Sequence, residues 1–295
     1  MPVNVRDIVR SSTQIREERE KPIRLAIVVE PDAPDELIET VRSCFRPATS
    51  LVRLGIDVSE PGATWAFHAA TDVVLGVAGS GAGGLDEAMA AAREQGHHAV
   101  VVGLGDDARA LAELAGHPYA DCLADPDPSR LVEEELGAWL VEHIAGKRLA
   151  FAHNFEFMRS AVAEEAVKAT ATQNALIGAV VFVPGADMPL MTLNQAKMLL
   201  QIAAAYGQPL GTERAKELFA VVGGGFALRA VARQALGLVP GFGWAVKGAV
   251  GYAGTIAMGK AAVTYFEQGG DLSGFARKAV EARDAAVKRL KRADV

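Results

Sequence analysis

Short apolar runs rich in valine alternate with helical patterns through the first half of this chain of 295 residues. Such runs, each followed by a helix, are typical of parallel strands buried on both faces. We expect strands at residues 23–29, 51–57, 72–78, 99–104 and 119–123, and helices at 34–45, 85–95, 107–115 and 129–145. The alternation therefore predicts a three-layer, Rossmann-like α/β domain with a parallel sheet over residues 23–146.

The second half of the chain predicts only helices. A long helix is expected at 149–183, where Pro184 and Gly185 would end it, and another at 189–206. The stretch 221–266 contains ten glycines, and each would cost a water-exposed helix about 1 kcal/mol. We therefore expect these glycines at close contacts between helices or in a membrane environment. Residues 1–22 precede the first strand as an N-terminal arm.

Two stretches of the second half resemble a known family: VPGADMPLMTLNQAKMLLQIAAAYG (183–207) and GLVPGFGWAVKGAVGYAGTIAMGKAAVTYFEQGG (237–270). On these residues the segment 173–270 resembles the domain of unknown function 697 family, which includes YcjF-like bacterial inner-membrane proteins and C-terminal extensions of certain GTPases. The resemblance implies an α-helical, often membrane-associated module, commonly near a GTPase-like domain. We therefore expect such a module at 147–270, followed by a basic amphipathic tail at 271–295.

This family context suggests that residues 23–146 are a degenerate GTPase-like domain. In a working GTPase, P-loop amides cradle phosphates, a lysine neutralises their charge and a hydroxyl binds magnesium. None of these groups occurs between Glu30 and Asp35, where three carboxylates would repel phosphate. The segment GIDVSEPGA (55–63) is similar to a switch motif with too long a spacing, and VVVGLGDD (100–107) keeps only Asp106 where guanine would be recognised. We expect the architecture of a GTPase without its chemistry.

A glycine-rich loop after the third expected strand supports a competing hypothesis. Gly79, Gly81 and Gly84 spell Gly-x-Gly-x-x-Gly, and Asp106 follows at the end of the next strand. In a dinucleotide-binding fold such glycines allow a pyrophosphate to approach, and the acid binds a ribose hydroxyl. That motif usually opens its domain, whereas here two strand–helix units precede it. We favour a connecting loop, and keep a nucleotide-binding enzyme as the alternative.

The sequence shows neither the spacing of metal ligands nor a catalytic constellation. The preferred hypothesis is therefore a non-catalytic protein that needs no cofactor.

Asp187 is the most prominent polar residue of the helical half. It follows the Pro-Gly break and precedes Pro189, a position where its carboxylate would cap the next helix. Alternatively, Asp187, Asn194 and Gln195 form a polar contact for a partner or an ion within an apolar bundle.

Charge is distributed unevenly along the chain, with a net −12 over residues 1–172 and +6 over residues 173–295. The acidic half argues against nucleic-acid binding. In the other half, a basic cluster beside apolar sequence predicts attraction to an anionic membrane surface. The cluster consists of Lys288, Arg289, Lys291 and Arg292. Basic residues divide the glycine-rich sequence into apolar pieces of 11 to 13 residues, shorter than the about 20 that a span needs.

We therefore expect a protein at the cytoplasmic face of the inner membrane, peripheral or integral, since the N-terminus lacks the apolar segment of a signal peptide. The preferred function is a non-catalytic, membrane-associated or scaffolding protein with a pseudo-GTPase-like domain. Its expected partners are an anionic membrane surface or a membrane-associated protein assembly, and a homo-oligomer is compatible with the sequence.

Overall fold

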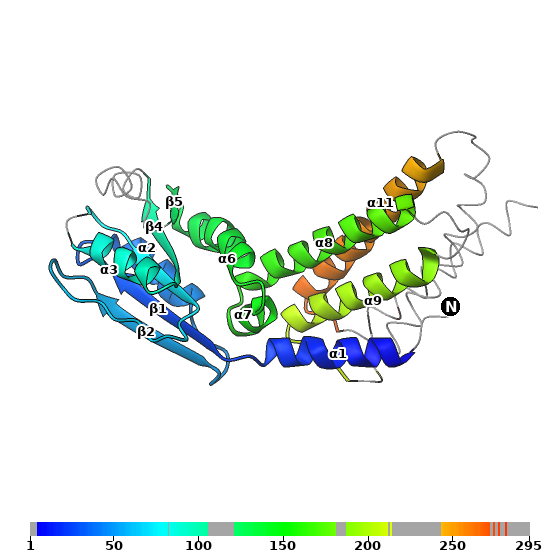
Figure 1. Ribbon diagram of the computed structural model, residues 1–295, viewed down its shortest axis with the longest axis horizontal. Coiled ribbons are helices and arrows are strands. Elements are labelled where there is room, and N and C mark those ends of the chain that lie inside the picture. Colours follow the sequence, from blue (N-terminus) through cyan, green and yellow to red (C-terminus); the bar gives the residue numbers. More distant parts are fainter. Residues whose placement is uncertain are drawn as a thin grey trace, which may run out of the picture. The chain divides into compact units, whose positions relative to one another are not determined.

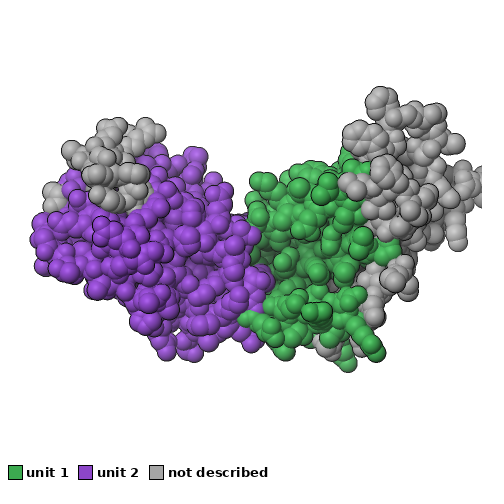
Figure 2. Space-filling model, viewed as in Figure 1, with its two compact units in different colours: residues 1–17, 162–295 green, residues 18–161 purple. Residues whose placement is uncertain are grey.

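The computed structural model describes residues 5–81, 83–105, 121–180, 187–211 and 243–271, with positions 213, 274, 277 and 281. The chain divides into two compact units, coloured in Figure 2. Residues 18–161 form the α/β unit, and residues 1–17 with 162–295 form the helical unit. The expected fold class, a Rossmann-like α/β domain followed by a helical module, is confirmed.

Within the described residues, the α/β unit contains a sheet of five parallel strands (Figure 1). The strands are β1 Ile23–Val29, β2 Val52–Val58, β3 Val73–Val77, β4 His98–Leu104 and β5 Asp121–Asp125. Their order is β2-β1-β3-β4-β5, and every neighbouring pair is parallel. This is the flavodoxin-like order of doubly wound folds, whose topological switch point lies between β1 and β3.

Helices α2 (Asp35–Cys44) and α3 (Leu85–Glu94) cover opposite faces of the sheet. α3 packs in a buried cluster with Val28 and Val74, whereas α2 lies over Ile27 and Val29. Successive side chains of a strand point to opposite faces, so these two contacts are on different sides. β3 is buried at every position, as expected for the central strand of three layers.

After β5 the chain continues through α5 (Pro128–Arg130), a π-helical segment η1 (Leu131–Leu136), α6 (Gly137–His143) and α7 (Arg148–Asn154). Asp127 caps this series, since its Oδ1 accepts hydrogen bonds from the amides of Ser129 and Arg130. The expected helix at 129–145 is therefore present, with a π-helical segment inside it. The helix expected at 107–115 lies outside the described residues.

The long helix expected from residue 149 is interrupted at Phe155. The Asn154 carboxamide accepts hydrogen bonds from both the amide and the hydroxyl of Thr49, at 3.1 and 2.7 Å. Phe155 then adopts an extended conformation and is fully buried, with its ring centroid 5.2 Å from that of Phe45. Tertiary contacts with the 45–49 segment thus override the helical pattern, which resumes as α8 (Met158–Val180).

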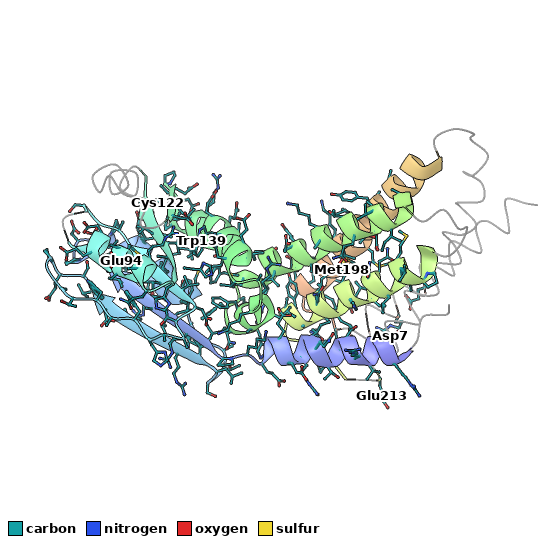
Figure 3. All side chains as sticks on the ribbon, viewed as in Figure 1. Asp7, Glu94, Cys122, Trp139, Met198 and Glu213 are labelled. Carbon is teal, nitrogen blue, oxygen red and sulfur yellow. The ribbon has the colours of Figure 1, made fainter. Side chains whose placement is uncertain are left out.

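The helical unit is formed by parts of α1 (Val5–Arg19) and α8, with α9 (Asp187–Ala205) and α11 (Gly243–Glu267). Met198 of α9, labelled in Figure 3, is fully buried. α11 packs closely on α8: a Cβ atom at Gly248 would lie 3.1 Å from the carbonyl oxygen of Ala175, and one at Gly259 would overlap the side chain of Val167. At these positions the glycines serve close helix packing.

Candidate functional site

The glycine-rich loop at 79–84 lies at the topological switch point of the sheet, where doubly wound folds bind their ligands. It connects the end of β3 to the start of α3, and the segment after β1 lies against it. Gly81 and Gly84 have φ angles of 84° and 77°, which other residues adopt only with strain. Gly79, Gly81 and Gly84 therefore lie in one loop, as the sequence predicts.

The carboxylate of Glu30 occupies the space that this loop surrounds. Glu30 Oε2 accepts hydrogen bonds from the amides of Gly79 and Gly81, at 2.7 and 3.1 Å, and Oε1 accepts one from Gly83 at 2.9 Å. The residue is only 1% exposed. Backbone amides that converge in this way form an anion-binding concavity, the kind that holds phosphate in nucleotide sites. In this protein the anion is a side chain of the chain itself.

Asp32 adds a second carboxylate at the rim of the same loop. Its Oδ2 accepts a hydrogen bond from the amide of Ser80 at 3.2 Å. Hydrogen bonding by the Ser80 side chain is the main cause that lowers the pKa of Asp32; desolvation opposes it, and the backbone hydrogen bond from Ser80 adds to the lowering. Both acids of the 30–32 turn are thus engaged by the glycine loop.

Close approach of the chain explains the glycines of this loop without a ligand. A Cβ at Gly79 would overlap the carboxylate of Asp32, and one at Gly83 would lie 2.9 Å from Pro31 and 3.1 Å from Glu30 Oε1. A Cβ at Gly84 would lie 2.9 Å from the backbone of Glu60. The Gly-x-Gly-x-x-Gly pattern therefore corresponds to a loop that packs against two other turns of the α/β unit.

From the sequence, Glu30 was interpreted as a group that would repel phosphate and, with Asp32 and Asp35, as part of a solvated turn or a cation site, not as the ligand of the glycine loop. The informative signal was an acid directly after β1, because the glycine loop follows the neighbouring central strand β3 at the same edge of the sheet. Asp106, the expected ribose-binding acid, lies outside the described residues. Within the described parts of the chain, no group of three or more His, Cys, Asp or Glu side chains could hold a metal ion.

A second polar cluster lies inside the helical unit. Thr255 Oγ1 accepts hydrogen bonds from Asn174 Nδ2 at 3.0 Å and from Gln195 Nε2 at 2.9 Å, and donates one to the carbonyl of Gly251 at 2.8 Å. Asn194 Nδ2 donates to Asn174 Oδ1 at 3.2 Å. Asn174, Gln195 and Thr255 are all buried, so the cluster joins α8, α9 and α11.

The structure thus brings Asn194 and Gln195 together with two residues that the sequence did not single out, Asn174 and Thr255. One donor and two acceptor positions are what a hydroxyl offers, so the three hydrogen bonds of Thr255 leave its hydroxyl no capacity for a ligand. Asp187 begins α9, but its side chain lies outside the described set. The tail residues Lys288, Arg289, Lys291 and Arg292 also lie outside it.

Comparison with protein families identifies the helical part. Residues 147–292 match the family described as "Domain of unknown function (DUF697)". This segment is a DUF697 domain. The match confirms the resemblance and extends it on both sides, from α7 to the tail. A comparison with curated proteins and one with solved structures gave no match. In the described part of the DUF697 domain and of the rest of the chain, no helix has the length and apolarity that a membrane span requires.

Proposed function

We propose that the protein is non-catalytic, and that it joins a DUF697 domain to a pseudo-GTPase-like α/β unit whose ligand loop is filled from within. The observation that supports this function is the Glu30 carboxylate on the amides of Gly79, Gly81 and Gly83. Those amides are the groups with which a nucleotide-binding loop at this point of the fold would hold phosphate.

Electrostatics supports the same conclusion. A phosphate at this loop would either have to displace a buried, triply hydrogen-bonded carboxylate or lie directly beside it. If phosphate displaces the Glu30 carboxylate, that carboxylate loses its three hydrogen bonds. If both remain, two negative charges lie side by side in a desolvated site. Neither route is favourable, and among the described residues Glu30 forms no ion pair with a basic side chain.

The first test is a thermal-shift panel with GTP, GDP, ATP and NAD, each with and without magnesium. A nucleotide that binds the folded state raises its free energy of unfolding by about 2.7 kcal/mol when present at 100 times its Kd. We expect no shift and no hydrolysis above background. A saturable shift, or magnesium-dependent hydrolysis lost on substitution of Asp57 or Asp106 by Ala, would instead support the alternative function, a nucleotide-binding enzyme that uses the loop at the switch point.

The role of the DUF697 domain in this proposal is attachment to an anionic membrane surface or to a membrane-associated assembly. Support comes from the net charge of +6 over residues 173–295 and from the basic cluster at 288–292. Near an anionic surface each Lys or Arg contributes roughly 1 kcal/mol, and salt weakens the attraction. Apolar sequence beside the cluster would add buried area at the interface.

The second test is flotation of the full chain with liposomes. We expect binding to vesicles that contain phosphatidylserine, little binding to phosphatidylcholine vesicles, and release by high salt. Replacing Lys288, Arg289, Lys291 and Arg292 by Gln should weaken binding to the anionic vesicles. If the chain ignores anionic vesicles, the membrane role is wrong and scaffolding alone remains. Resistance of the bound protein to both salt and alkaline carbonate would indicate integral insertion.

A further inference from the structure

Strand β2 is an edge of the described sheet, and the direction of its backbone groups can be assigned. The carbonyl of Leu51 accepts from Ile23 of β1, and the amide of Ser59 donates to Val29 of β1. Along a strand, successive residues turn their N–H and C=O groups to alternate sides. Residues 53, 55 and 57 therefore face β1, whereas residues 52, 54, 56 and 58 direct their N–H and C=O groups outward.

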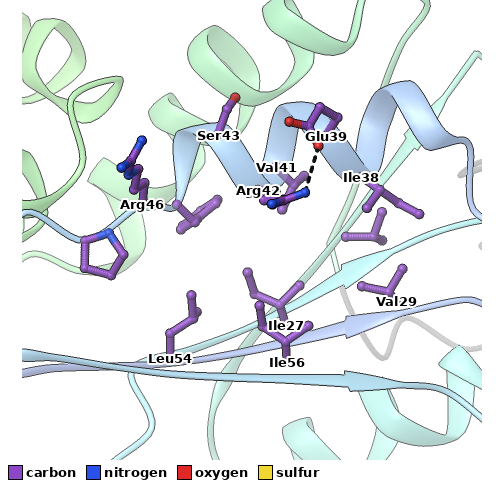
Figure 4. Close-up of a pocket in the computed structure, with 13 residues that line it drawn as sticks. Ile27, Val29, Ile38, Glu39, Val41, Arg42, Ser43, Arg46, Leu54 and Ile56 are labelled. Atoms are coloured by element: carbon purple, nitrogen blue, oxygen red, sulfur yellow. Dashed lines mark hydrogen bonds and ion pairs between the residues drawn. The ribbon is translucent and has the colours of Figure 1, made fainter.

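The side chains of this edge are unusually apolar on one face. Ile56 is 60% exposed and Val58 59% exposed. Leu54 and Ile56 line a cavity of about 720 Å³ that lies between the sheet and α2, together with Ile27 and Ile38 (Figure 4). Native proteins usually protect edge strands with proline, a bulge or inward-pointing charges. β2 has no proline, and it pairs with β1 in an unbroken register.

The opposite face of β2 carries two charges of opposite sign, Arg53 and Asp57, placed symmetrically about Gly55. Both side chains are exposed. Asp57 makes no hydrogen bond or ion pair with any described residue, and the Arg53 guanidinium donates only to the backbone carbonyls of Ser50 and Val52. A Cβ at Gly55 would have only the Leu25 carbonyl oxygen nearby, at 3.9 Å, so the centre of the strand is open.

We propose that β2 pairs antiparallel with β2 of a second copy of this chain, about a two-fold axis at Gly55, to give one continuous sheet. In this register Leu54 lies opposite Ile56 of the second copy, and Val52 opposite Val58. All four residues have outward N–H and C=O groups, as hydrogen-bonded antiparallel pairs require. The strand is thus complementary to itself, as a two-fold interface demands.

The charges select this register over its neighbours. Arg53 lies opposite Asp57 of the second copy in a non-hydrogen-bonded pair, where facing side chains are closest. Symmetry produces the same ion pair a second time. A shift of the register by two residues would place Arg53 opposite Gly55 or Ser59 and leave both charges without a partner. The second copy would also extend the apolar face formed by Leu54 and Ile56.

Charge reversal in the full chain tests the proposal by light scattering after size exclusion and by sedimentation equilibrium. We expect the wild type to form a dimer. Asp57→Arg or Arg53→Asp alone should raise the dimer dissociation constant at least about tenfold, because facing charges become alike. Arg53→Asp combined with Asp57→Arg should restore the dimer. An equimolar mixture of the two single variants should form heterodimers, since one then carries only positive charges and the other only negative charges at these positions.

Glu94→Arg is the matched control, because Glu94 is exposed at the end of α3 (Figure 3) and its reversal changes the net charge as Asp57→Arg does. It should leave the dimer intact, and thermal melting should show that every variant is folded. A wild type that stays monomeric, or a dimer that both single reversals leave unchanged, overturns the proposal. Neither outcome bears on the nucleotide panel, because the Glu30 loop takes no part in this interface.

Discussion

At the scale of single residues, Glu30 joins two loops of the α/β unit through hydrogen bonds to backbone amides. A buried carboxylate is costly unless hydrogen bonds replace its water, and here three backbone amides do so. The relation is mutual, because Gly79 and Gly83 would have buried, unpaired N–H groups without Glu30. Glu30 therefore contributes three of the hydrogen bonds that join the turn after β1 to the loop after β3.

Glu30→Gln tests this dependence with almost no change in shape. The neutral amide retains one acceptor oxygen but turns a donor group towards backbone N–H groups. We expect the free energy of unfolding to fall by about 1.5–3 kcal/mol, the range for hydrogen bonds to a charged group. Urea denaturation measures the change. Asp32→Asn serves as control and should have a clearly smaller effect, because Asp32 is exposed. Equal losses for both variants would contradict the assigned role of Glu30.

At the scale of helices and strands, the contact between α8 and α11 depends on the absence of side chains. Gly259 of α11 lies against Val167 of α8 so closely that a Cβ would overlap the valine side chain. Gly248 and Gly251 approach the α8 backbone in the same way, with Cβ positions 3.1 Å from the carbonyl oxygens of Ala175 and Asn174. Small residues thus set the distance between these two helices.

Gly259→Ala should therefore destabilise the helical unit through overpacking, by about 1–3 kcal/mol. Thermal or chemical unfolding followed by circular dichroism measures the loss. The double variant Gly259→Ala with Val167→Ala removes the atoms in conflict and should recover part of that stability, beyond the sum of the single effects. A neutral Gly259→Ala variant would show that α8 and α11 are further apart than described.

The elements of the α/β unit were largely predictable because their signals are local. Apolar runs place β1 at the expected residues 23–29, and β2 to β5 within one or two residues of their predicted ends. The break at Phe155 was not predictable, because it depends on Thr49 and Phe45, which are more than a hundred positions away. The same limit applies to the candidate site. The glycine loop is visible in the sequence, but the carboxylate that it binds, Glu30, follows a different strand, β1. Thr255 likewise gains its role only from α8 and α9.

At the scale of the whole molecule, acidity should act on the α/β unit through two histidines. Partial burial, then the neighbouring His143 and Arg93, lower the pKa of His98 from its ordinary 6.5. Burial, then Arg19 and Arg159, lower the pKa of His153. Both groups bind protons more readily in the unfolded chain. Their contribution to stability is therefore complete above about pH 6.5 and is lost as the pH falls towards their folded-state pKa values.

We expect the melting temperature of the α/β unit to fall between pH 7 and pH 5.5, and to fall less in the variant His98→Gln with His153→Gln. Glu18 works in the opposite direction, since burial raises its pKa above 4.5 and its protonation favours the folded state. The comparison is therefore made with Glu18→Gln introduced into both proteins, the one with His98 and His153 and the one with both replaced by Gln. Identical pH profiles with and without the two histidines would refute the prediction.

The internal carboxylate of the α/β unit also has a consequence for what the molecule can sense. A GTPase switch changes conformation with the nucleotide it holds, and so its state follows the ratio of GTP to GDP in the cell. In this α/β unit the anion bound by the loop is the side chain of Glu30, so every molecule contains it. Under the proposed function, such a unit would keep one conformation whatever the ratio of GTP to GDP, and any partner would meet a surface that is independent of the energy supply.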